Sequence, residues 1–166
     1  MKKWIAILAV LLVVVCASGC TSQPQTYSGN GITFQYPGDW SGNWTSEIQQ
    51  SVGSSSTVLT SLGKDNAGMA VAKVNIGSVP ISIADLTSTM KSGFQSAGYQ
   101  SVTEKTRTVS GENATEIDFK YNVSSTQNYG SFTFFKKNTD IYMIMISTPD
   151  NNQQTIDMIL NSFKVL

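Results

Sequence analysis

The segment that most constrains the fold is residues 141–146, which are apolar at every position. A strand with one wet face alternates apolar and polar residues, so an unbroken apolar run indicates a strand that is buried on both faces. The turn residues Asn138, Thr139 and Asp140 precede this run, and Pro149 follows it, where a strand must stop. We therefore expect a central strand with a further layer covering each of its faces.

Other segments alternate apolar and polar residues with a period of two, which predicts half-buried strands. In residues 113–123, for example, Ile117 and Phe119 alternate with Glu116 and Asp118, so one face of this strand is expected to be exposed to solvent. Short polar turns join most of these segments, which favours antiparallel hairpins. The expected strands are residues 32–36, 58–62, 70–76, 99–109, 113–123, 131–137 and 141–147.

Two segments show the three-to-four-residue apolar spacing of amphipathic helices. The first, residues 83–97, follows Ser82, which can cap it, and stops at Gly98. The second ends near residue 163 and has Asp150 as its candidate N-cap. Elsewhere in the chain, the residues before position 58 are expected to form a polar spacer. Six or seven strands with two helices predict an α+β domain built on an antiparallel sheet.

The N-terminal residues follow the pattern of an export signal. Lys2 and Lys3 give a positive start, residues 5–15 are an unbroken apolar run, and the small residues 17–19 come directly before Cys20. This ending resembles a lipobox, in which the cysteine thiol receives a diacylglyceryl group. An uncut membrane anchor and an ordinary signal peptide are the alternatives, but the apolar run is shorter than the roughly 20 residues of a spanning helix.

These patterns predict the organisation of the whole chain. Residues 1–19 form the lipoprotein signal peptide, residues 20–30 the lipidated Cys20 and a polar tether, and residues 31–166 a single domain. Cys16 would be removed with the signal, so Cys20 would be the only cysteine of the mature chain and no intramolecular disulfide could form. The expected location is the outer face of the cell membrane, where the lipid on Cys20 is the anchor.

Charge and residue usage argue against several classes of function. Lysine plus arginine and aspartate plus glutamate number 11 each, so no basic field is available to hold nucleic acid. Histidine, the usual general base and the commonest metal ligand, does not occur in the chain. We therefore expect no catalytic residue, no metal ligand set, no cofactor and no enzymatic activity.

Two short motifs could suggest chemistry. Ser88 and Lys91 match the Ser-x-x-Lys motif of penicillin-binding proteins, but Ser88 lies opposite the apolar stripe of its helix and the companion Lys-Thr-Gly is missing. Asn43, Asn113 and Asn122 begin Asn-x-Ser/Thr sequons, which are glycosylated only in an organism that modifies exported proteins in this way. A solvated helix face and unmodified surface residues are the simpler interpretations.

Clusters of polar or aromatic residues allow a binding interpretation beside a structural one. Oxygen ligands for calcium could come from residues 65–66, 140 and 150–152, but turns and helix caps already explain them. Large aromatic residues could line a binding surface, although they more often belong to a core. These residues are Trp40, Trp44, Tyr27 and Tyr99.

Residues 32–40, which read ITFQYPGDW, resemble the opening strand of PsbP-like proteins, where an apolar-aromatic strand runs into Tyr-Pro, two turn residues and Trp. Residues 159–165 are similar to the way that family ends. The resemblance implies an α/β/α sandwich, in which helices flank a central antiparallel sheet of about six strands. It also implies an accessory or binding protein of prokaryotic origin, since lipoproteins with such domains occur in bacteria and in archaea, including methanogens.

Two functional hypotheses follow from the signal, the tether and the expected fold. The first is a membrane-anchored extracytoplasmic lipoprotein that acts as a non-catalytic accessory or binding module for another cell-envelope component. The second is a carrier of a small ligand or metal ion, with a pocket between sheet and helix. The sequence itself identifies neither the ligand nor the partner.

Overall fold

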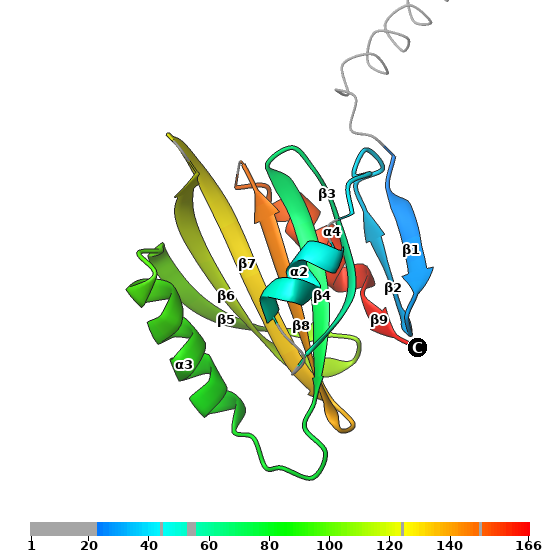
Figure 1. Ribbon diagram of the computed structural model, residues 1–166, viewed down its shortest axis with the longest axis vertical. Helices are drawn as coiled ribbons and strands as arrows, with labels where there is room; N and C mark the ends of the chain where they lie inside the picture. Colours follow the sequence, from blue (N-terminus) through cyan, green and yellow to red (C-terminus); the bar gives the residue numbers. More distant parts are fainter. Residues whose placement is uncertain (1–22, 44, 53–55, 124, 150) are drawn as a thin grey trace, which may run out of the picture.

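The structure is a computed structural model that describes residues 23–166 except positions 44, 53–55, 124 and 150 (Figure 1). The described part is mostly β, with a six-stranded sheet, a three-stranded sheet and three short helices. In chain order the elements are β1 (Gln25–Gly29), β2 (Ile32–Tyr36), α2 (Thr45–Val52), β3 (Thr57–Lys64), β4 (Ala67–Asn75), α3 (Ile83–Ser96), β5 (Gln100–Val109), β6 (Glu112–Val123), β7 (Thr126–Lys137), β8 (Asp140–Thr148), α4 (Gln153–Ser162) and β9 (Lys164–Val165).

The six-stranded sheet has the order β3-β4-β8-β7-β6-β5, and each neighbouring pair is antiparallel. The apolar strand β8 lies inside the sheet between β4 and β7, which confirms the central position expected from its sequence. Its residues Ile144 and Ile146 are fully buried, and Ile141 is 4% exposed. The expected hairpins β3–β4, β5–β6 and β7–β8 are also present.

Two hydrophobic cores lie on opposite faces of β8, because successive residues of a strand point to opposite faces. One core joins the sheet to α4, and the other joins it to α3. In Figure 1, α3 covers the end of the sheet that contains β5 and β6. The first core includes Tyr142, Ile144, Ile146, Ile156, Ile159 and Leu160, and the second includes Ile141, Phe119, Phe132 and Phe134 with Leu86, Met90 and Phe94 packed against it.

The three-stranded sheet β1-β2-β9 corrects the expected tether. The sequence predicts a polar tether over residues 20–30, but Gln25–Gly29 form β1, which pairs with β2 along its whole length. Local pattern missed this strand because Tyr27 is its only large apolar residue. The ring of Tyr27 stacks on Phe34, with 5.0 Å between the ring centroids. The folded domain therefore begins before residue 31, whereas the expected signal peptide and Cys20 lie outside the described residues.

The helices differ from expectation in two places. Helix α2 occupies part of the segment expected to be a polar spacer. Side-chain hydrogen bonds join it to β3: the backbone N–H of Val58 donates to Gln49 Oε1 at 2.7 Å. Helix α3 is capped by Ser82 as expected. The cap of α4 is Asn152, whose Oδ1 accepts from the Thr155 N–H at 3.1 Å, whereas Asp150 lies outside the described residues.

Candidate functional site

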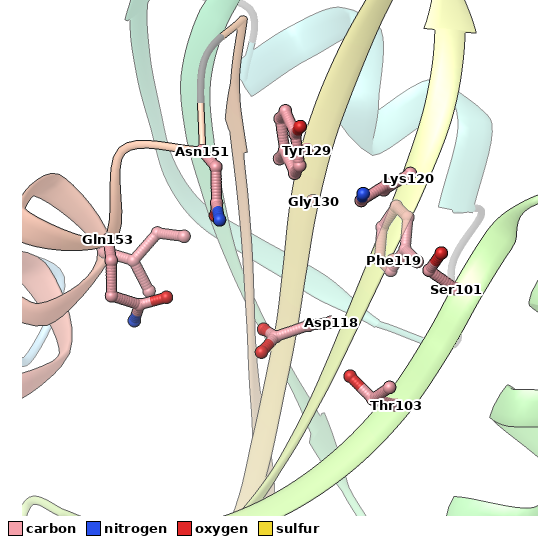
Figure 2. Close-up of a pocket in the computed structure, with 10 residues that line it drawn as sticks. Ser101, Thr103, Asp118, Phe119, Lys120, Tyr129, Gly130, Asn151 and Gln153 are labelled. Atoms are coloured by element: carbon pink, nitrogen blue, oxygen red, sulfur yellow. The ribbon is translucent and has the colours of Figure 1, made fainter.

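A cleft lies between the start of α4 and the strands β5, β6 and β7 (Figure 2). Its volume is about 240 Å³, which is the space of several water molecules at ~30 Å³ each. Most of its lining side chains are polar, and they come from segments that are distant in the sequence. The cleft is lined by Ser101, Thr103, Asp118, Phe119, Lys120, Tyr129, Gly130, Asn151, Gln153 and Ile156.

Strand register brings the polar side chains of the sheet together. Asp118 and Lys120 are two residues apart on β6 and therefore point to the same face. Thr103 of β5 is paired with Asp118, and Tyr129 of β7 is paired with Lys120. The Lys120 ammonium lies 5.2 Å from the centre of the Tyr129 ring, which is within the range of a cation–π contact.

The opposite wall of the cleft is formed by Asn151 and Gln153, at the turn where α4 begins. The cap at Asn152 fixes this turn, and the amide groups of Asn151 and Gln153 lie across the cleft from Asp118 (Figure 2). Gln153 also donates one of its two Nε2 hydrogens to Asp157 Oδ1 at 3.1 Å, which leaves the other hydrogen and Oε1 for a ligand. The cleft thus presents one ammonium, one carboxylate, two amides, two aliphatic hydroxyls and the phenol of Tyr129.

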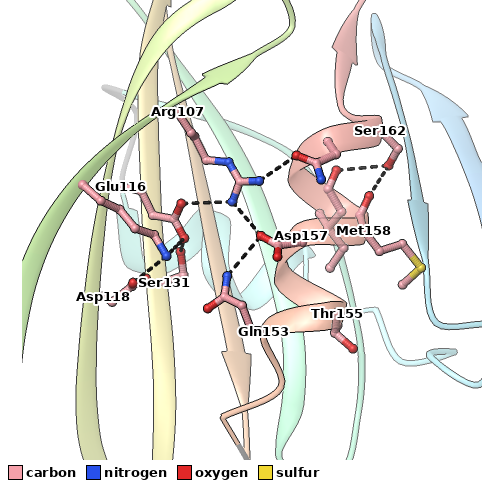
Figure 3. Close-up of polar contacts among 12 residues, drawn as sticks. Arg107, Glu116, Asp118, Ser131, Gln153, Thr155, Asp157, Met158 and Ser162 are labelled. Atoms are coloured by element: carbon pink, nitrogen blue, oxygen red, sulfur yellow. Dashed lines mark hydrogen bonds and ion pairs between the residues drawn. The ribbon is translucent and has the colours of Figure 1, made fainter.

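A buried ion-pair network lies beside the cleft (Figure 3). The Glu116 side chain is 0% exposed, and its Oε2 lies 3.0 Å from Nη1 of Arg107. Its Oε1 lies 3.3 Å from the Lys105 ammonium and accepts a hydrogen bond from Ser131 Oγ at 2.8 Å. A carboxylate removed from water needs such partners, since an unpaired buried charge is strongly destabilising.

The burial of Glu116 shows that the exposed face we expected for residues 113–123 is wrong at this position. Helix α4 packs over this face. Arg107 of β5 donates hydrogen bonds to two residues of this helix, to Asp157 Oδ1 at 3.1 Å and to Asn161 Oδ1 at 2.7 Å. The alternating charged residues of β6 are typical of a solvent-exposed face. In the structure, the carboxylates of Glu116 and Asp118 instead form ion pairs with the cations of β5. The signal that could have revealed this is the matching alternation of Lys105 and Arg107 in the neighbouring strand.

Lys105 is the titratable group whose environment shifts its pKa most clearly among the described residues. Burial by itself lowers the pKa of Lys105, but the hydrogen bond to Asp118 and the negative charges of Glu116 and Asp118 outweigh it and raise the pKa. The Lys105 ammonium is 2.8 Å from Asp118 Oδ2. Lys105 therefore remains charged at neutral pH, where it neutralises carboxylates instead of exchanging protons.

The residues expected to carry modifications are not brought together. Asn43, Asn113 and Asn122 are each exposed, at separate points of the fold. Cys20 lies outside the described residues. Ser88 is exposed on α3, in agreement with the solvated helix face, and Lys91 one turn later forms an ion pair with Glu104 of β5 at 3.0 Å.

The aromatic residues considered as a binding surface lie in different places. Trp40 is 6% exposed and belongs to the core beneath α4. Tyr99 belongs to the other core and stacks on Phe119 with 4.9 Å between ring centroids. Tyr27 packs on β2, and Trp44 lies outside the described residues. The three described residues therefore do not form a shared surface.

The acidic and amide residues considered as calcium ligands have structural roles in turns and caps. Asp65 adopts a left-handed conformation in the β3–β4 turn, with φ of 51°, and Asp140 accepts from Asn75 Nδ2 at 2.6 Å. Within the described ranges, no three Asp, Glu or Cys side chains gather where they could hold a metal ion. The described residues also include no helix of the length and apolar character that a bilayer crossing requires.

Comparison with known proteins places the chain in a broader context. A family model described as PsbP-like protein matches residues 5–165. A Bacteroides thetaiotaomicron crystal structure superposes with a TM-score of 0.56 and 8% identity over 88% of this chain, which spans only 49% of that protein. At this identity the likeness concerns the fold alone.

Two further solved structures superpose less well. A Pseudomonas aeruginosa protein of unknown function gives a TM-score of 0.40 with 9% identity, covering 75% of this chain and 82% of its own. LpqN, described as involved in cell envelope biogenesis of Mycobacterium tuberculosis, gives 0.45 with 12% identity, covering 86% of this chain and 90% of its own. No curated protein sequence matches the chain.

Proposed function

This chain belongs to the PsbP-like protein family, and from that premise we propose that it is a non-catalytic accessory module that binds another component of the cell envelope. The observation that supports a binding role is the cleft between α4 and β5–β7, where hydroxyls, amides and one ammonium converge. We also propose that its two sheets and three helices are a variant of the α/β/α sandwich, with β1-β2-β9 sharing a layer with α4.

The second part of the proposal is a lipid anchor on Cys20 at the outer face of the cell membrane. Its support is the small-residue ending of residues 17–19 directly before Cys20. Because β1 begins at Gln25, only residues 21–24 would separate the lipidated residue from the folded domain. Four extended residues span at most about 14 Å, so the domain would work close to the headgroups. Two acyl chains hold a protein stably in a bilayer, whereas one holds it only marginally.

The anchor is tested by replacing Cys20 with Ser in the full chain, with Cys16→Ser as the matched control, because Cys16 lies in the segment that processing would remove. The variants are expressed in a host that processes lipoproteins, and membrane and soluble fractions are compared together with the intact mass. We expect Cys20→Ser to be released or to remain unprocessed, and Cys16→Ser to behave as wild type. A Cys20→Ser protein that is trimmed normally and stays in the membrane would show that the anchor is not this cysteine.

The accessory role is tested by cross-linking in intact membranes. Anchored wild-type chain should yield the same cross-linked envelope protein in repeated preparations, and the released Cys20→Ser form should yield it less efficiently because its local concentration at the membrane falls. The absence of any reproducible partner would contradict the accessory role.

A carrier of a small molecule is the second candidate function, and the cleft favours it specifically. A metal cargo is less well supported, because among the described lining residues Asp118 is the one carboxylate and it is bound by Lys105. Thermal unfolding of the full chain in detergent separates the two candidates. A bound small ligand raises the midpoint temperature, whereas a protein scaffold responds only to its partner.

A further inference from the structure

We infer that the cleft beneath the start of α4 binds a small organic anion that also carries hydroxyl groups, and that Lys120 recognises its negative charge. The inference deepens the proposed binding role by naming a ligand class, and it is independent of the lipid anchor. Its basis is the charge distribution of the cleft, the chemistry of its walls and its volume.

Lys120 is the cation that lines the cleft, and it differs in its partners from the cations of the neighbouring ion-pair network. Lys105 lies 3.3 Å from Glu116 and 2.8 Å from Asp118, and Arg107 lies 3.0 Å from Glu116 and 3.1 Å from Asp157. Within the described part of the chain, by contrast, no carboxylate pairs with Lys120. Its contact is the face of the Tyr129 ring, which holds the ammonium in place without neutralising it. An anion in the cleft would supply the missing counter-charge.

The negative charge nearest to the ligand, that of Asp118, is ion-paired through one of its two oxygens. Asp118 lines the cleft; its Oδ2 is bound by Lys105, and its buried Oδ1 has no hydrogen-bond partner among the described residues, so a ligand hydroxyl could donate to it. The first turn of α4 adds a positive contribution, because the unpaired N–H groups of a helix start carry partial positive charge. A ligand anion beside Lys120 therefore meets one cation and a favourable dipole, and among the described lining residues its one carboxylate neighbour is the ion-paired Asp118.

The remaining walls recognise hydroxyl groups. Ser101 and Thr103 offer hydroxyls that both donate and accept, and Asn151 and Gln153 offer amides that do the same. In Figure 2 these groups come from opposite sides of the cleft, the hydroxyls from β5 and the amides from the start of α4. A ligand with several hydroxyls can bond to both walls at once, whereas an apolar ligand would leave these groups unsatisfied.

The volume sets the size of the ligand. About 240 Å³ corresponds to roughly eight waters at ~30 Å³ each. That space accommodates a sugar acid or a glycerol phosphate. The same chemistry occurs free in solution and on the headgroup of phosphatidylglycerol, so the experiment includes a probe for each source.

The test is an NMR titration of the full chain in nonionic detergent, followed through the backbone amides of Thr103, Gly130 and Gln153. The probes are glucuronate, glycerol 3-phosphate and, as the neutral match of glucuronate, glucose. Nanodiscs of phosphatidylglycerol are compared with nanodiscs of phosphatidylcholine. We expect saturable shifts with at least one anionic probe and none with glucose at the same concentration. Shifts confined to phosphatidylglycerol nanodiscs would assign the ligand to a lipid headgroup, and shifts with the soluble anions would assign it to a solute.

Variants test the role of Lys120 in the same titration. Lys120→Met keeps an apolar stem over Tyr129 and should weaken anion binding about tenfold or more, whereas Lys120→Arg should retain it. Lys136→Met, at an exposed lysine of β7, is the matched control and should bind as wild type. Equal binding of glucose and glucuronate, undiminished binding by Lys120→Met, or no shift with any probe would each overturn the inference.

Failure of this inference is distinguishable from failure of the proposed function. Release of Cys20→Ser and cross-linking to an envelope partner are measured without any ligand. If both succeed while the cleft stays empty with every probe, the accessory role stands and the ligand class is wrong.

Discussion

The guanidinium of Arg107 joins the fully buried carboxylate of Glu116 to helix α4, and so connects two layers of the fold (Figure 3). It lies 3.0 Å from Glu116 on the neighbouring strand and 3.1 Å from Asp157 on the helix. The same helix forms one wall of the candidate cleft through Gln153. The position of that wall relative to β5–β7 therefore depends on an ion pair as well as on the apolar core.

Replacing Arg107 with Met should destabilise the domain by about 3 kcal/mol, because it leaves the buried Glu116 with Lys105 and Ser131 as its remaining partners. Urea unfolding at neutral pH measures the change. The control is Lys64→Met, which breaks the exposed ion pair with Asp39 and should cost at most about 1 kcal/mol. Adding Glu116→Gln to Arg107→Met should recover part of the lost stability, because it removes the buried charge. Equal destabilisation by Arg107→Met and Lys64→Met would refute the structural role of the buried pair.

Replacing Gly130 with Ala should destabilise the domain by about 1–3 kcal/mol, because a Cβ at this position would lie 2.3 Å from the ring of Phe119 on the neighbouring strand. Gly93→Ala is the opposite control. It lies in helix α3, where a Cβ meets nothing within 4 Å, and it should stabilise by about 0.5–1 kcal/mol. The two variants should shift the thermal midpoint in opposite directions, and a stabilising Gly130→Ala would contradict the packing described.

The sequence predicts the elements whose signals are local. The run of residues 141–146 identifies the central strand, and Ser82 identifies the start of α3, because apolar periodicity and capping are written into neighbouring residues. Strand β1 and helix α2 carry few apolar residues. Their stability comes from pairing with β2 and from side-chain bonds to β3, and neither partner is indicated by the local pattern.

The candidate site is less predictable than the fold because its parts meet only in three dimensions. Lys120 and Tyr129 approach Gln153 from segments that are far apart in the chain. The burial of Glu116 depends on Arg107, which depends in turn on Asp157, fifty residues away in the sequence. No spacing within one element reveals such a cluster, so charge alternation in β6 was naturally interpreted as a solvent-exposed face.

The ion pairs of Lys105 should make stability fall in alkaline solution. Because the pKa of Lys105 is raised in the folded state, its contribution is fully present below the unfolded lysine pKa of about 10.4 and is lost as pH rises through the folded pKa. The free energy of unfolding of wild type should therefore exceed that of Lys105→Met by a constant amount at pH 7–9. The gap should begin to close above the unfolded lysine pKa of about 10.4 and should vanish only above the raised folded pKa of Lys105.

The size of this effect is modest, below about 1 kcal/mol, because the Lys105 side chain is 41% exposed and its pairs are screened by solvent. The difference between wild type and Lys105→Met at each pH is the quantity to follow. Lys136→Met provides the reference for an exposed lysine. A gap that widens with alkaline pH would contradict the raised pKa of Lys105.

The N-terminal strand β1 should contribute to stability mainly through Tyr27, since its ring stacks on the buried Phe34 while most of the other β1 side chains are exposed. Tyr27→Ala removes this stacking and the apolar area that it covers, and should cost about 1–3 kcal/mol in urea unfolding. Thr26→Ala, at the exposed neighbouring position, should change stability by less than about 0.5 kcal/mol. Because Phe34 also stacks on Phe163, at 5.9 Å, the loss should extend to the end of α4 and appear as faster amide exchange there. Equal stability of Tyr27→Ala and Thr26→Ala would show that residues 25–29 contribute no more to stability than a tether would.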